Sequence, residues 1–224
     1  MKKKILIVLQ ARIQSYRLPA KVLMPLSKLK LPLAVLCSRR LSNLGHKVIL
    51  AIPSIKKDDI LNKTLKKYKL ETSRGSHKNV FSRYLNATKK LRDNDIVIRA
   101  TSDNPLPDGS FIKKTLNFFR KNKLDYLDTH KIFNLPYGVV VQVFYVKVLR
   151  ELNKRPIIEG DKEHVCVTMS KKKFNYKKYK SPYNFKKKIK KKLSIDNYQD
   201  YKRIKKLFEN IKDPVNTKWE SIVR

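Results

Sequence analysis

Three short segments of the chain carry the residues whose chemistry could serve a reaction. The first, residues 11–23, places Arg12, Arg17 and Lys21 directly after an aliphatic run. An arginine can bind two phosphate oxygens at once, and a lysine ammonium can meet negative charge that develops on a bridging oxygen. Loop amides can add further donors. The segment predicts a phosphate-binding turn, although the same spacing would also suit a solvated basic loop.

The second and third segments each place an aspartate directly after an apolar run. Asp103 follows the run that ends at Ala100, and Asp196 follows Leu193–Ile195. A carboxylate at the end of a strand suits a hard divalent cation whose shell is completed by water. Each could instead be structural, Asp103 as a loop cap and Asp196 as a helix N-cap. If folding joins them, they could share one Mg²⁺ with a leaving pyrophosphate.

The order of apolar runs and amphipathic segments predicts an α/β fold that would position these residues. We expect strands over residues 4–9, 47–51, 95–100, 138–146 and 193–195, and helices over residues 31–44, 58–68, 79–91, 110–121, 147–152, 161–170 and 197–208. Such alternation favours a mixed, mostly parallel sheet with helices on both faces. The loops that follow the strands then meet at one edge, where open α/β sheets bind their ligands.

Composition indicates one globular domain, residues 1–224, expected in the cytoplasm. Hydrophobic residues make up 41% of the 224 positions, enough for a core at this length. No apolar run reaches the roughly 18 residues of a membrane span, and the one after the basic start is too short for a signal peptide. The two cysteines, Cys37 and Cys166, show no metal-binding spacing, so we expect buried free thiols.

Charge is the most unusual feature of the composition. The 54 basic and 18 acidic residues give a net charge of +36. This could indicate nucleic-acid or anionic-membrane binding. Because the excess is mainly lysine and is spread along the chain, solvated lysine faces are the favoured interpretation. Residues 171–192 hold twelve lysines, no acid and several aromatics. They could grip single-stranded nucleic acid, but a solvated ribbon or loop within the domain is favoured, and nucleic acid is not an expected partner.

A family resemblance emerges from these motifs taken together. Residues 11–23 resemble the A-R-x-x-S-x-R-L-P-x-K-x-L signature of the cytidylyltransferase family, which includes enzymes that activate 3-deoxy-manno-octulosonic acid and sialic acid with CTP. The similarity is greatest to a branch named after a spore coat polysaccharide biosynthesis protein. Further blocks match in order: Arg74-Gly75-Ser76 with Val80 and Arg83-Tyr84, residues 99–106, Pro136-Tyr137-Gly138 before Gln142-Val143-Phe144, Glu163-His164-Val165, and Ser194-Ile195-Asp196 before Asp200-Tyr201.

The resemblance implies a Rossmann-like nucleotide-diphospho-sugar transferase fold and transfer of CMP from CTP to an acidic sugar, with release of pyrophosphate, in surface glycan biosynthesis. It implies catalytic roles for Arg12, Lys21 and Asp103, and Mg²⁺ held by Asp103 and Asp196. Nucleotide binding would fall to Ala11, Arg12, Ser15, Arg17, Lys21, Asp103 and, on the base or ribose side, Arg74, Gly75 and Ser76. Acceptor binding would fall to Asn104, Gln142, Glu163 and His164. A homodimer is also implied.

The chain departs from the family pattern in its first loop. Gln14, Tyr16 and Ala20 stand where the family commonly has Gly, Thr and Gly, and Gln142 stands for a frequent Glu. Glycine lets backbone amides approach a phosphate closely, and the Tyr16 ring could crowd a triphosphate. Two alternatives therefore stay open: a catalytically inactive homologue that binds a nucleotide or a partner, and a basic nucleic-acid-binding protein.

Overall fold

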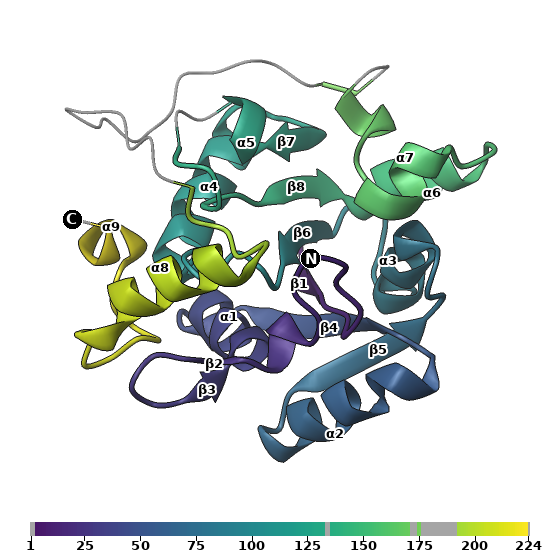
Figure 1. Cartoon of the computed structure of the whole chain (residues 1–224). Coiled ribbons are helices and arrows are strands. Elements are labelled where there is room, and N and C mark those ends of the chain that lie inside the picture. Colours follow the sequence, from purple (N-terminus) through teal and green to yellow (C-terminus); the bar gives the residue numbers. More distant parts are fainter. Residues whose placement is uncertain (1–2, 133–134, 171–173, 176–191, 224) are drawn as a thin grey trace.

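The computed structural model describes residues 3–132, 135–170, 174–175 and 192–223 (Figure 1). The strands are β1 (Ile5–Gln10), β2 (Pro25–Leu26), β3 (Leu31–Pro32), β4 (Lys47–Pro53), β5 (Glu71–Gly75), β6 (Ile96–Thr101), β7 (Tyr126–Asp128) and β8 (Gln142–Tyr145). The helices are α1 (Leu33–Ser42), α2 (Asp59–Lys67), α3 (Val80–Thr88), α4 (Gly109–Lys121), α5 (Thr129–Ile132), α6 (Val146–Asn153), α7 (Glu159–His164), α8 (Tyr198–Glu209) and α9 (Trp219–Ile222).

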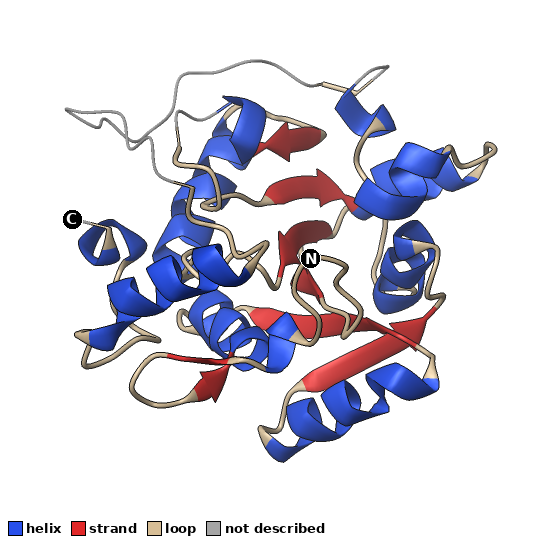
Figure 2. Ribbon diagram, in the orientation of Figure 1, coloured by secondary structure: helices blue, strands red, loops and turns tan. Residues whose placement is uncertain are grey.

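A six-stranded sheet forms the centre of the fold, in the order β5-β4-β1-β6-β8-β7 (Figure 2). Strands β5, β4, β1 and β6 run parallel, and β8 is antiparallel to both of its neighbours. Strand β7 therefore points the same way as β6. The mixed, mostly parallel sheet predicted from the sequence is confirmed. Its carboxyl edge gathers the loops after β1 and β6, the end of β7 and the start of β8.

Alternating side chains of β1 face two separate halves of the core, as the period of a strand requires. Ile7 and Leu9 pack with residues of α1, α2, α4, α8 and α9, whereas Leu6 and Val8 pack with residues of α3 and α6. Figure 1 shows these two helical layers on opposite faces of the sheet. A strand buried on both faces explains why residues 5–9 form a continuous aliphatic run.

The structure corrects several expected elements. Leu193–Ile195 is not a strand but an extended loop, and the strand expected over residues 138–146 begins only at Gln142. The helix expected over residues 161–170 is instead α7 followed by a separate 3₁₀ turn, Thr168–Ser170. Strands β5 and β7 were not expected. The ribbon or loop predicted for residues 171–192 lies outside the described residues except at 174–175 and 192.

The two cysteines and the start of α4 are as local sequence requires. Cys37 and Cys166 are buried free thiols, and burial raises the pKa of each far above its ordinary value. Asp108 caps α4, because its side chain accepts a hydrogen bond from Phe111 N at 2.9 Å. Within the described part of the chain, no helix is long and apolar enough to cross a bilayer.

Candidate active site

A cleft of about 570 Å³ opens at the carboxyl edge of the sheet. Its walls come from the loops after β1 and β6, the facing ends of β7 and β8, the end of α7 and the loop before α8. Eleven of the residues predicted for the site line it: Ala11, Arg12, Ser15, Arg17, Lys21, Asp103, Asn104, Gln142, Glu163, His164 and Asp196. Segments far apart in the sequence thus contribute to one cavity, as expected for this kind of sheet.

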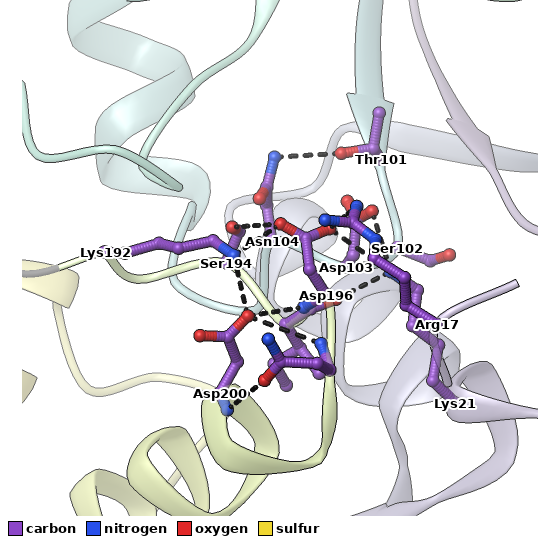
Figure 3. Close-up of polar contacts among 12 residues, drawn as sticks. Arg17, Lys21, Thr101, Ser102, Asp103, Asn104, Lys192, Ser194, Asp196 and Asp200 are labelled. Atoms are coloured by element: carbon purple, nitrogen blue, oxygen red, sulfur yellow. Dashed lines mark hydrogen bonds and ion pairs between the residues drawn. The ribbon is translucent and has the colours of Figure 1, made fainter. Parts of the chain in front are cut away.

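Lys21 lies at the centre of the cleft floor. Its ammonium nitrogen donates to Ile195 O at 2.6 Å and to Asp103 Oδ2 at 3.1 Å, and it lies 3.8 Å from Asp196 Oδ1. The side chain is almost fully buried, so the group cannot simply point to solvent. Figure 3 shows the carboxylates of Asp103 and Asp196 directed toward one another around this lysine. The fold therefore brings together Asp103 and Asp196, as the sequence predicted.

Asp196 is surrounded by cations. Arg17 NH2 approaches Asp196 Oδ1 at 2.9 Å, and Lys192 Nζ approaches Asp196 Oδ2 at 2.6 Å. Burial alone would raise the pKa of Asp196, but Lys192, Lys21 and Arg17 outweigh burial and lower that pKa below its ordinary value. Asp196 is therefore a carboxylate at neutral pH, which is the form a hard metal ion or a cationic side chain binds.

The loop that carries Asp196 is fixed by backbone contacts rather than by a strand ladder. Leu193 N donates to Tyr137 O at 2.7 Å, and Ile195 N donates to Asp103 O at 2.9 Å. Gly138 has a φ of +104°, and a Cβ there would lie 2.4 Å from the carbonyl carbon of Leu193. Only glycine allows this approach. The loop thus couples the two aspartates directly, because the backbone of one is bonded to the segment of the other.

The N-terminus of α8 completes the support of Asp196. Asn197 is the helix N-cap and forms a capping box with Asp200, so Asp196 itself is not the cap. Asp200 Oδ2 accepts from Asp196 N at 3.0 Å and from Lys192 Nζ at 2.7 Å. Figure 3 shows Lys192 between Asp196 and Asp200. Releasing Asp196 from the capping role leaves its carboxylate free to face the cleft.

The first loop forms a closed turn over the cleft. Ala20 N donates to Ile13 O at 2.9 Å, and the buried Asp58 accepts from Ile13 N at 2.8 Å. Ala20 has a φ of +55°, in the left-handed region. Tyr16 is fully exposed, so its ring does not fill the cavity. The turn therefore leaves the cationic groups around a cavity that is open to a ligand.

The predicted acceptor-binding residues occupy the other side of the cleft. Asn104 Nδ2 donates to Thr101 Oγ1 at 2.8 Å, which holds the amide against the end of β6. Glu163 and His164 are exposed at the end of α7, with His164 Nε2 and Glu163 Oε2 3.9 Å apart. Gln142 accepts from Arg99 NH1 at 2.7 Å through its amide oxygen.

Three residues predicted to bind the nucleotide do not line the cleft. Arg74 lies on the edge strand β5 and pairs with Asp59 at 2.7 Å, outside the cavity. A Cβ at Gly75 would lie 3.2 Å from Arg83 Cγ, and Ser76 O accepts a hydrogen bond from Arg83 NH1. This segment therefore supports Arg83, which does line the cleft, rather than presenting its own side chains to it.

Several cleft residues were not predicted to belong to the site. Arg83, Arg99 and Asp128 line the cavity, together with the ring-bearing residues His130 and Tyr137. Arg83 and Arg99 fall within the matching sequence blocks, so their charge was a usable signal. Asp128 was harder to recognise because β7 is only three residues long.

The donor set for a metal consists of two carboxylates. Among the described residues, no group of three or more His, Cys, Asp or Glu side chains is close enough to hold an ion. Asp103 and Asp196 offer the hard oxygen ligands that Mg²⁺ prefers, and Mg²⁺ is usually held by one or two carboxylates plus substrate phosphates. The residues present therefore fit a magnesium ion that arrives with a nucleotide.

The sheet order and the cleft define the class: the protein has an α/β nucleotidyltransferase fold. The chain belongs to the cytidylyltransferase family, whose sequence profile matches residues 6–219. It is 29% identical over 219 residues to the spore coat polysaccharide biosynthesis protein SpsF of Bacillus subtilis, which covers 92% of this chain and 86% of that protein. Membership of this family supports a nucleotidyltransferase activity.

Solved structures share the fold. A cytidylyltransferase from Leptospira borgpetersenii superposes with a TM-score of 0.85 at 23% identity and covers 99% of this chain and 93% of that one. A CMP:2-keto-3-deoxy-manno-octonic acid synthetase, solved in complex with CTP, superposes with a TM-score of 0.64 at 13% identity, with coverages of 92% and 98%. The expected family and fold are thus both confirmed.

Proposed function

We propose that the protein transfers CMP from CTP to an acidic sugar, with release of pyrophosphate, in the synthesis of a surface glycan. The observation that carries the proposal is the convergence of Asp103 and Asp196 on the ammonium of Lys21, in a cleft that four arginines also line. This arrangement suits a bound triphosphate, because phosphoryl transfer needs positioning and charge neutralisation more than a covalent nucleophile. The CTP-bound relative and the SpsF relative support the choice of nucleotide and pathway.

In the proposed reaction, the acceptor hydroxyl oxygen forms a bond to the α-phosphorus of CTP. The bond from that phosphorus to the bridging oxygen breaks, and the bonding pair leaves with pyrophosphate while the hydroxyl proton passes to water. Arg12 and Arg17 hold the phosphates, and Lys21 stabilises the negative charge on the leaving group. Asn104, Gln142, Glu163 and His164 would surround the acceptor.

Mg²⁺ is the proposed cofactor, with Asp103 and Asp196 as its protein ligands. When bound, it would neutralise phosphate charge and polarise the phosphate oxygens. In the ligand-free chain, Lys21, Arg17 and Lys192 balance the two carboxylates.

The test is a pyrophosphate-release screen of the four nucleoside triphosphates with Mg²⁺ against 3-deoxy-manno-octulosonic acid and N-acetylneuraminic acid. We expect release that requires both CTP and one of the sugars. The Asp103→Ala variant should lose at least about 100-fold in turnover while keeping its circular dichroism spectrum. Asp93→Ala, which removes an exposed carboxylate outside the cleft, is the matched control. No release with any pair, or full turnover by Asp103→Ala, would reject the proposal.

A further inference from the structure

The acceptor side of the cleft contains a buried carboxylate that the proposed reaction does not use. Asp128 ends β7, and only 5% of its surface is exposed, yet it is part of the cleft wall. Gln142 pairs in register with Arg99 on β6 and with Asp128 on β7. The three side chains therefore form one polar row across β6, β8 and β7. Figure 1 shows these three strands beside one another.

The hydrogen bonds along this row run in one direction. Arg99 NH1 donates to Gln142 Oε1 at 2.7 Å, and Gln142 Nε2 donates to Asp128 Oδ2 at 2.9 Å and to Tyr126 OH at 3.0 Å. The amide of Gln142 is thereby occupied at both ends. Gln142 thus acts in this state by positioning Asp128, not by offering free groups to a ligand.

Asp128 is left as the acceptor that faces the cavity. Its Oδ2 also accepts from Tyr126 OH at 3.2 Å, and its Oδ1 accepts from His130 N at 3.0 Å. A carboxylate has about four acceptor positions, and these contacts fill three of them. The position that remains, on Oδ1, can accept one more hydrogen bond.

The lack of a counter-ion beside the Asp128 carboxylate, in the residues that the structure describes, also favours a ligand group that donates a hydrogen bond. Within the described ranges, no Lys, Arg or His side chain forms an ion pair with it, although the cleft contains several cations. Removing a carboxylate from water without a counter-ion is costly unless hydrogen bonds compensate. A further donor from a ligand would therefore be favourable, whereas a sugar carboxylate placed directly beside Asp128 would be disfavoured.

We propose that Asp128 binds a hydroxyl group of the acceptor sugar and thereby sets its orientation, with the sugar carboxylate turned away from β7. This inference rests on the proposed function, because it takes the second ligand of the cleft to be a sugar. It assigns Asp128 as a specificity-determining residue, with Gln142 and Arg99 as the positioning residues behind it.

The experiment measures sugar binding directly, apart from turnover. Calorimetric titration of 3-deoxy-manno-octulosonic acid and N-acetylneuraminic acid into the CTP-loaded chain without Mg²⁺ gives the dissociation constant for wild type and for Asp128→Asn. We expect Asp128→Asn to weaken binding of the accepted sugar by about 10- to 100-fold, the effect of a lost hydrogen bond to a charged group. CTP affinity should change less than about twofold, because Asp128 lies on the acceptor wall.

Asp125→Asn is the matched control. Asp125 precedes the same strand, pairs with Lys147 at 2.7 Å, and does not line the cleft. We expect its sugar affinity to equal that of wild type. Deoxy derivatives of the accepted sugar provide a test that needs no variant: removal of one particular hydroxyl should weaken binding to wild type by a similar factor. That deoxy sugar should bind wild type and Asp128→Asn equally, as expected for two partners of one contact.

The outcomes separate this inference from the proposed function. If wild type turns a sugar over and Asp128→Asn binds that sugar as tightly as wild type, the inference fails and the proposed function stands. If wild type binds a sugar through Asp128 but releases no pyrophosphate, the inference stands and the proposed function fails. If the chain binds neither sugar, both proposals fail. If no single deoxy substitution weakens sugar binding to wild type, the inference fails, and this result does not depend on whether Asp128→Asn folds.

Discussion

Lys21 is the residue on which the chemistry of the cleft floor depends. It lies between two carboxylates, one from the loop after β6 and one from the loop before α8, and it is buried, so its position is fixed by its partners. A fixed cation beside a triphosphate costs no reorganisation when charge develops during the reaction. The same cation balances the aspartates before a ligand arrives, so it serves both the resting fold and the proposed transition state.

Replacing Lys21 should separate these two roles. Lys21→Met keeps the length of the side chain but removes the charge, and we expect CTP-dependent pyrophosphate release to fall by about 100- to 1000-fold. The fold should persist, because Asp196 keeps its contacts with Arg17 and Lys192. Steady-state kinetics measure the effect, with Lys28→Met, an exposed lysine outside the cleft, as the control. A loss below threefold would contradict the role given to Lys21.

Ala20, the neighbour of Lys21, holds a conformation that suits glycine better. Its φ of +55° lies in the left-handed region, which costs an alanine roughly 1 kcal/mol relative to its usual conformations. We expect Ala20→Gly to raise the free energy of unfolding by up to about 1 kcal/mol, since it relieves this strain at a small entropic cost. Urea denaturation measures the change. The control is Ala87→Gly, within α3, which should instead lower the free energy of unfolding by about 1 kcal/mol. If Ala20→Gly lowers the free energy of unfolding by the same amount, Ala20 is not strained.

At the scale of elements, the N-terminus of α8 decides where Asp196 points. Asn197 caps α8, and Asp200 completes the capping box while accepting from Lys192 and Arg203. Burial alone would raise the pKa of Asp200, but the bonds from Lys192 and Arg203 outweigh it and hold that pKa well below its ordinary value. The ionised form of Asp200 therefore stabilises the fold.

Asp200→Asn tests this linkage through pH. Because the pKa of Asp200 is lower in the folded state, its contribution is fully present above the unfolded value of 3.8 and is lost as pH falls through the folded pKa. We expect Asp200→Asn to be less stable than wild type by about 1 kcal/mol at pH 7, with a difference that shrinks as pH falls below 3.8. Chemical denaturation across pH measures this. Glu209→Gln, exposed near the end of the same helix, should show no such trend; a pH-independent difference at position 200 would refute the linkage.

The sequence predicts the strands and helices whose apolar residues are buried in a regular pattern. It does not predict the segments whose conformation depends on hydrogen bonds to neighbouring segments. Strand β1 and helix α4 were predicted because their periodicity reflects burial on defined faces. Strand β5 reads Glu-Thr-Ser-Arg-Gly and lies at the sheet edge, so its pairing with β4 leaves little hydrophobic signal. Leu193–Ile195 has a strand-like sequence, but its amides bond to Tyr137 and Asp103 instead of a neighbouring strand.

The same distinction applies to the site. The meeting of Asp103 and Asp196 followed from one rule, that strand-end loops share an edge, although the second loop turned out not to follow a strand. Arg74 was misplaced because a sequence block shows which residues occur together, not which side chain faces the cleft. Arg83, from the same block, is held toward the cavity by the backbone of Ser76 and His77. Such hydrogen bonds depend on the conformation of the folded loop, so the spacing of residue types in the sequence does not reveal them.

At the scale of the whole molecule, one buried ion pair ties the C-terminal segment to α1 and to the start of α4. Arg40 of α1 and Asp108, which caps α4, approach to 3.5 Å, and both are essentially inaccessible. Arg40 also donates to Leu106 O at 2.7 Å and to Thr217 O at 3.0 Å, and Asp108 accepts from Trp219 N at 2.6 Å. The pair thereby joins three segments that are distant in the sequence and closes the core behind the cleft.

Removing one member of this pair should destabilise the entire fold rather than one element. Arg40→Leu leaves the Asp108 carboxylate buried without its cation, and breaking a buried pair in this way costs about 3–5 kcal/mol. Urea unfolding, followed by the fluorescence of Trp219, measures the change, since the tryptophan is buried against Phe111 in the same region. Arg39→Leu, which removes only a partly exposed contact with the Tyr68 ring, should cost about 1 kcal/mol or less. Equal losses at positions 39 and 40 would mean that burial of the charge pair is not what holds the C-terminal segment in place.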